Sequence, residues 1–193
     1  FSGDVFVARA FKPLNTILEL MHNKPQNWKK IFIFLGKTGQ NELIQASKDD
    51  PDIILLTSDL GFNVFEPFRD SFPKQFFNIG VAENNMVGVG SGLALKGKKV
   101  FIYSIIPFLI FRCFEQIRNI ICHNTLNVKL IGAGGGFSYG NQGISHNPTE
   151  DLSILRSLPN LTIFTPGTKI ETELALDIML KQTGPSFIRL GKV

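Results

Sequence analysis

Cysteine is scarce in this sequence. Of its 193 residues only Cys113 and Cys122 are cysteines, nine positions apart and without a C-x-x-C pair. No histidine stands at a metal-ligand spacing from them, so the pattern favours two buried thiols over a redox or metal site. Free thiols are typical of proteins in a reducing cytoplasm, which is the compartment we expect.

Long apolar runs and dense blocks of positive charge are also missing. The longest apolar run, 105–111, contains Pro107 and ends at Arg112, whereas a membrane helix needs about 20 residues. The 20 basic and 16 acidic residues give a net charge of +4, and the lysines are scattered. We therefore predict neither a membrane segment nor a nucleic-acid interface, which would need clustered charge and interleaved aromatics. No signal peptide is visible, and the chain starts at Phe1, which leaves an upstream segment open.

What the sequence does contain is a regular alternation of short apolar runs and helix-length segments. The runs are continuous, which indicates strands buried on both faces of a parallel sheet. The predicted strands are 52–57, 76–79, 99–103, 128–131, 161–164 and 186–190, and the predicted helices are 42–48, 82–95, 107–122, 151–157 and 169–182. The fold class is therefore α/β, with an open, mostly parallel sheet in a three-layer α/β/α arrangement.

The beginning of the chain is less regular. Residues 1–30 form an N-terminal segment of unclear structure, with a possible short helix at 14–22. The run I-F-I-F-L at 31–35 is either a short strand or the buried face of an N-terminal segment. We assign 31–193 to a single domain, a size that suits one large α/β unit.

Open α/β sheets keep their sites at the carboxyl ends of the strands. Four predicted loops meet at this edge, at 58–63, 80–83, 104–111 and 132–146. Side chains in these four loops are therefore the candidates for chemistry.

Glu83 is the most informative of these side chains. It stands in the run N-I-G-V-A-E-N-N-M-V-G-V-G-S-G-L-A, residues 78–94, where every other polar group is neutral. An ionised Glu is seldom buried unless it is paired. Glu83 is therefore either a helix-start acid, worth a few tenths to about 1 kcal/mol through the helix dipole, or a site residue.

The run G-A-G-G-G-F-S-Y-G-N-Q-G-I-S-H, residues 132–146, is the longest glycine-rich loop. It lacks the Lys-Ser/Thr of a phosphate-binding loop and does not open a helix, so a nucleotide site is not indicated. His146 ends the loop at the predicted functional edge of the sheet. It is either an ordinary loop histidine or a group that moves protons.

Several blocks of this sequence, in order, resemble the pyrimidine-binding domain of transketolase and its thiamine-diphosphate-dependent relatives. They are L-L-T-S-D-L-G-F, the run around Glu83, F-E-Q-I-R-N, and G-N-Q-G-I-S-H-N-P-T-E-D-L-S-I-L-R-S-L-P-N-L-T-I-F-T-P. The similarity extends from about Asp52 to Lys192 and implies a thiamine-diphosphate-binding fold. It also implies thiamine diphosphate and Mg²⁺ as cofactors.

The resemblance implies a role for Glu83. In the family this Glu hydrogen-bonds a ring nitrogen of the aminopyrimidine, which activates the reactive carbon of the cofactor. That role needs a carboxyl group in a dry pocket with few competing partners.

Other roles follow from the same resemblance. Phe108 and Phe111, which helical spacing alone would assign to the core, match the segment that stacks on the pyrimidine ring, and Phe108 is the better candidate. Asp59 matches an acid near the cofactor. His146 matches a histidine that contacts the substrate oxygen, and Lys192 stands where some relatives bind the sugar phosphate.

The sequence also departs from the family. Gln142 stands where sugar transketolases have an aspartate that contacts the donor, which puts the usual ketose-phosphate donors in doubt. The G-D-G and Asn-Asn motif for diphosphate and magnesium is missing. We therefore expect the diphosphate-binding domain to come from another subunit or segment, in a homodimer or a heterotetramer.

The predicted reaction is transfer of a two-carbon ketol unit between sugar or sugar-phosphate substrates. A decarboxylating relative acting on a 2-oxo acid, similar to deoxyxylulose-phosphate synthase or the beta chain of a 2-oxo-acid dehydrogenase, is the alternative. A non-catalytic assembly module is the third possibility. The chain alone is expected to be inactive.

Overall fold

A computed structural model describes residues 28–191 of the protein, with side chains from residue 39 onward. The predicted short helix at 14–22 and the predicted phosphate ligand Lys192 lie outside the described residues. The division of the chain at residue 31 stays a prediction.

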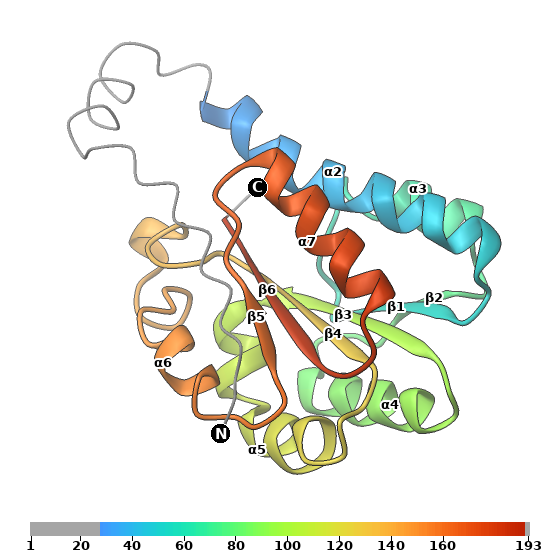
Figure 1. Ribbon diagram of the computed structural model, residues 1–193. Coiled ribbons are helices and arrows are strands. Elements are labelled where there is room, and N and C mark those ends of the chain that lie inside the picture. The colour runs from blue at the N-terminus through green and yellow to red at the C-terminus, as the bar shows by residue number, and fades with distance from the viewer. Residues whose placement is uncertain (1–27, 192–193) are drawn as a thin grey trace.

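A parallel sheet of six strands forms the centre of the molecule, in the order β2-β1-β3-β4-β6-β5 (Figure 1). Each adjacent pair of strands is parallel. The strands are β1 (Ile53–Thr57), β2 (Phe76–Asn78), β3 (Lys99–Ile105), β4 (Val128–Ala133), β5 (Thr162–Phe164) and β6 (Ser186–Leu190). Every residue of β1 and β4 is buried, as expected for strands covered on both faces.

Helices cover both faces of the sheet and complete the predicted three layers (Figure 1). One face carries α2 (Trp28–Asp49), α3 (Glu66–Ser71) and α7 (Lys169–Lys181). The other carries α4 (Glu83–Leu95), the consecutive turns η1 (Pro107–Phe111), α5 (Phe114–Gln116) and η2 (Ile117–Cys122), and α6 (Asp151–Leu155). Each layer packs on its own apolar cluster, and the two clusters lie on opposite sides of the strands.

The small residues of α4 let this helix lie close to the sheet. A Cβ on Gly90 would meet the Ile102 side chain of β3 at 2.7 Å and Leu56 of β1 at 3.3 Å. Met86 and Val87, one turn earlier, are fully buried on the same side. This contact fixes the first turn of α4, and with it Glu83, relative to the ends of β1 and β3.

One of the two interpretations of residues 31–35 is excluded, and one predicted helix was wrong. Residues 31–35 lie within α2, so the strand alternative does not hold. The single helix expected at 107–122 is instead divided into π-helical η1 (Pro107–Phe111), α5 (Phe114–Gln116) and π-helical η2 (Ile117–Cys122). In η1 the Arg112 N–H donates to the Pro107 carbonyl five residues back, which widens the turn. Helix α3 and the 3₁₀ turn η3 (Gly140–Gln142) were not predicted.

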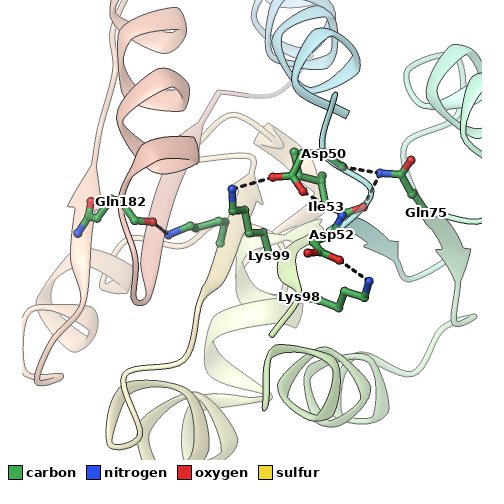
Figure 2. A network of polar contacts seen from close by, with 8 residues as sticks. Asp50, Asp52, Ile53, Gln75, Lys98, Lys99 and Gln182 are labelled. Carbon is green, nitrogen blue, oxygen red and sulfur yellow. Dashed lines mark hydrogen bonds and ion pairs between the residues drawn. The ribbon is translucent and has the colours of Figure 1, made fainter. Parts of the chain in front are cut away.

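Ion pairs tie the opposite, amino-terminal edge of the sheet. Lys99 contacts Asp50 at 2.7 Å and Lys98 contacts Asp52 at 2.5 Å, as Figure 2 shows. Close by, the buried Lys129 of β4 donates from Nζ to the Gln182 and Gly184 carbonyls, at 2.9 and 2.7 Å. Burial, together with the nearby positive charge of Lys99, lowers the pKa of Lys129 to about 8.

None of the helices in the described part of the chain combines the length and the hydropathy that crossing a membrane requires.

Candidate active site

The order of the strands gives the sheet a topological switch point at its carboxyl edge, where open α/β sheets have their ligand crevice. From β1 the chain continues to β2 on one side, whereas β3 pairs with β1 on the other. The connections therefore diverge between β1 and β3, and such a point is where open α/β sheets bind ligands. Ser58 follows β1 and Ser104 lies near the end of β3, and their hydroxyls are hydrogen-bonded at 2.9 Å.

Glu83 lies next to this pair of serines, in the first turn of α4. The residue is 1% exposed, and α4 has no side-chain cap at its start. One carboxylate oxygen, Oε2, accepts from Arg112 Nη1 at 2.5 Å, while Oε1 has a long contact of 3.4 Å with the Ser104 hydroxyl. Glu83 thus begins the helix, but its carboxylate is bonded to the Arg112 and Ser104 side chains rather than to the N–H groups of the helix end.

Burial also affects the thiol beside Glu83. Desolvation, and secondarily the negative charge of Glu83, raises the pKa of Cys113 to about 12. Burial alone raises the pKa of Cys122 to about 12. Both cysteines are free and buried, in agreement with the sequence-based expectation.

Aromatic and basic side chains extend the site outward from Glu83. The Arg112 guanidinium lies over the Phe108 ring, with Cζ 4.8 Å from its centroid. The His146 ring also meets the Phe108 ring edge-on, with the centroids 5.0 Å apart and the ring planes at 74°. Tyr139 contacts the His146 ring at 5.5 Å, and the Ser145 hydroxyl is 2.9 Å from His146 Nδ1. Glu83, Arg112, Phe108 and His146 therefore form one continuous row of contacts.

A buried ion pair anchors the loop that carries His146. Arg189 of β6 holds Asp151 through both carboxylate oxygens, at 2.7 and 3.2 Å, and donates to the Pro148 carbonyl at 3.3 Å. A Cβ on Gly135 would lie 2.8 Å from the same guanidinium, so the loop passes over it only because this residue is glycine. Arg189 thus lies against Gly135, near the start of the glycine-rich loop, and binds Pro148 and Asp151 just after its end.

Asp59 lies on the other side of the crevice, near β2. Its backbone is left-handed, with φ 57°, and its side chain accepts from Asn78 Nδ2 at 3.0 Å. Asn78 Oδ1 in turn accepts from the backbone N–H groups of Asp59 and Gly80. Asp59 and Asn78 border a cavity of about 290 Å³ that Phe62 and Arg69 also line.

The structure brings some of the predicted site residues together and separates others. Glu83, Phe108 and His146 belong to one row of contacting side chains. Asp59 is connected to that row less directly: the residue before it, Ser58, is hydrogen-bonded to Ser104, whose hydroxyl contacts Glu83. Phe111 is half-buried against the apolar cluster beneath α4, so Phe108 is the ring nearer to the other site residues. Sequence reasoning missed Arg112, although it follows Phe108 by one helical turn, and it missed Ser104, a polar residue within an apolar strand.

Residues 35–193 match the family described as "Transketolase, pyrimidine binding domain". The chain belongs to the transketolase family. It is 36% identical over 148 residues to one of the subunits of apulose-4-phosphate transketolase from Actinobacillus succinogenes, covering 76% of this chain and 48% of that protein. It is 31% identical over 157 residues to the protein of the same name from Phocaeicola vulgatus, covering 81% and 50%.

A solved structure confirms the fold of this transketolase-family chain. The structure described as "Split gene transketolase, inactive beta4 tetramer" superposes with a TM-score of 0.73 at 34% identity, over 82% of this chain and 51% of that one. The three-layer arrangement is therefore the thiamine-diphosphate-binding fold that the sequence predicted. The chain spans about half the length of the curated relatives it matches.

The family depends on thiamine diphosphate, and the site fits one half of that cofactor. Glu83 offers a buried carboxylate and Phe108 an aromatic face, and Arg112 contacts both. Such a combination suits a planar nitrogen heterocycle, because the carboxylate can accept from ring N–H groups while the ring stacks. Within residues that the structure describes, no group of three or more acidic, histidine or cysteine side chains could hold a metal ion. The half of the cofactor that these residues fit is the aminopyrimidine.

Proposed function

We propose that this chain is the pyrimidine-binding part of a transketolase-like enzyme that transfers a two-carbon ketol unit between sugar or sugar-phosphate substrates. The observation that carries the proposal is Glu83, a carboxylate only 1% exposed at the switch point of the sheet. When bound, thiamine diphosphate supplies a nucleophilic carbon and an electron sink for the transferred unit.

The side chains of this chain have distinct tasks in the proposal. The Glu83 carboxyl group hydrogen-bonds the pyrimidine ring nitrogen and exchanges a proton with it. Because Glu83 is buried, water does not compete for that hydrogen bond. Phe108 stacks on the ring. His146, next to Phe108 on the same side of the crevice, is placed to exchange a proton with a substrate oxygen. Asp59 lines the cofactor site from the β2 side, and Lys192 stays a predicted ligand for a substrate phosphate.

The proposal requires a diphosphate-binding partner that also supplies the ligands of Mg²⁺. The matched relatives are themselves named as transketolase subunits, and this naming and the half-length coverage support a separate subunit or segment for that part. One face of α4 offers a surface for it, since Gly88, Val89, Gly92 and Leu95 are exposed and uncharged. The two glycines let another backbone approach this helix closely.

The test combines the full chain with its diphosphate-binding subunit and follows ketol transfer and thiamine diphosphate binding. Glu83→Gln keeps the size of the side chain but cannot take up the proton. General acid–base contributions are about 10²- to 10⁴-fold, so we expect the rate to fall by at least about 100-fold. Glu115→Gln is the matched control, since Glu115 is an exposed acid on the segment that follows η1.

The outcomes separate the proposal from its alternatives. Equal activity of wild type and Glu83→Gln would refute the role of Glu83. Turnover with a 2-oxo acid but not with a ketose donor would favour the decarboxylating alternative, which the changed residue Gln142 motivates. Binding of the partner without cofactor binding or turnover would favour the assembly module.

A further inference from the structure

Arg112 is a charged side chain of the site to which neither the sequence nor the proposed function gives a task. Arg112 directly follows η1 in the chain, and its side chain contacts Glu83, which lies 29 residues earlier. Its Nη1 donates to Glu83 Oε2 at 2.5 Å, and its Cζ lies 4.8 Å from the centre of the Phe108 ring. The only other side chain bonded to the Glu83 carboxylate is Ser104, at 3.4 Å, so Arg112 is its principal partner among the described residues.

These two contacts match those that the proposed function assigns to the aminopyrimidine ring. A guanidinium group is planar, carries several N–H donors and stacks on aromatic faces. An aminopyrimidine protonated on its ring nitrogen has the same features: a flat face and N–H donors along one edge. The guanidinium and the aminopyrimidine each donate a hydrogen bond to the Glu83 carboxylate and each stack on the Phe108 ring. They cannot occupy the same carboxylate oxygen and the same ring face at the same time.

We propose that Arg112 is an internal competitor for the pyrimidine half-site, which must leave Glu83 and Phe108 when the cofactor ring binds. This inference rests on the proposed function. The exchange is physically accessible, because the Arg112 side chain is 46% exposed while that of Glu83 is 1% exposed. The Arg112 side chain can therefore rotate into solvent while the Glu83 carboxylate keeps its position.

The exchange also explains how a buried carboxylate is tolerated without cofactor. An unpaired buried charge is costly, and Arg112 supplies the compensating cation. When the ring binds, its N–H groups take over that task. Arg112 would thus protect the half-site until cofactor and partner arrive, at the cost of lowering the apparent affinity for the cofactor.

The size of this effect follows from the strength of the contact. A hydrogen bond to a charged group biases a two-state equilibrium by about 10- to 100-fold. The apparent dissociation constant rises by the inverse of the fraction that is open. Removing the competitor is therefore expected to tighten thiamine diphosphate binding by about tenfold or more.

The experiment titrates thiamine diphosphate into the full chain assembled with its diphosphate-binding subunit, by calorimetry. Wild type is compared with Arg112→Gln, which shortens and neutralises the side chain, and with Arg112→Lys, which keeps the charge but loses the planar group. We expect affinity to rise in the order wild type, Lys, Gln. Arg118→Gln is the matched control, since Arg118 is exposed and donates only to the adjacent Asn119 among described side chains.

A second readout follows the guanidinium itself. Side-chain nitrogen NMR of wild type should show a restrained Arg112 signal that becomes averaged when thiamine diphosphate is added. Unchanged or weaker binding by Arg112→Gln, or an Arg112 signal that the cofactor leaves unchanged, would overturn the inference while the proposed function stands. Absence of binding in every variant would overturn the proposed function, and the inference with it.

Discussion

The ion pair between Arg189 and Asp151 is expected to hold the loop of His146 in place, and removing one partner should be costly. Asp151 is 1% exposed and Arg189 is 23% exposed at their side chains. Breaking a buried pair from one side typically costs 3–5 kcal/mol, because a charge is left unpaired. Since Arg189 keeps some contact with solvent, we expect Arg189→Met to lower the free energy of unfolding by about 3 kcal/mol.

A double-mutant cycle separates the pair from its surroundings. Urea denaturation would compare wild type, Arg189→Met, Asp151→Asn and the double variant. The double variant removes both charges, so it should be more stable than the sum of the single losses predicts, with a coupling energy of about 2 kcal/mol. Additive losses would refute the reasoning, since they would mean that the two side chains do not interact.

The same variants test the connection to the site. Arg189 bonds the Pro148 carbonyl, two residues beyond His146, so a loosened loop should lower kcat more than it raises KM. If Arg189 acts through His146, Arg189→Met should add little to the loss already caused by His146→Ala. An equal further loss of activity in the His146→Ala background would show that Arg189 acts in another way.

Two further predictions concern the buried titratable groups. Because the pKa of Lys129 is lowered to about 8, the native state binds fewer protons than the unfolded state between about pH 8 and 10.5, so stability rises with pH across that window. Denaturation of wild type relative to Lys129→Met should show a gain of about 3 kcal/mol from pH 7 to 10.5, and a flat difference would contradict the lowered pKa. Burial raises the pKa of both Cys113 and Cys122 to about 12, so a thiol reagent at pH 8 should modify neither in the native protein and both in urea. Rapid modification of the native protein would contradict that burial.

The strands could be predicted from the sequence because their signal is local. The last strand was predicted with its exact bounds, Ser186–Leu190, and the others differ by one or two residues at an end. Each is a continuous apolar run between turn residues, which identifies a strand covered on both faces without knowledge of its neighbours. The resemblance to the family then gave Glu83 a predicted role at the cofactor, which composition alone left open.

The segment after β3 shows where this reasoning failed. Pro107 and the helical spacing of its apolar residues indicated one regular helix, yet the chain forms two π-helical turns around a short α5. Over a short segment an α-helix and a π-helix place the same few apolar side chains inward, so the pattern could not distinguish them. The type of helical turn determines where the Phe108 and Arg112 side chains point, and in the structure the Arg112 guanidinium lies over the Phe108 ring.

The sequence by itself determined the fold class, the positions of the strands and the residues Glu83, Phe108 and His146 as candidates, since each depends on a local pattern or a recognisable motif. Only the tertiary structure decided what these residues contact. The pairing of Glu83 with Arg112, and of Arg189 with Asp151, joins positions 29 and 38 residues apart. Such contacts depend on how parallel strands and their crossovers bring distant loops to one edge of the sheet, and no local spacing encodes that arrangement.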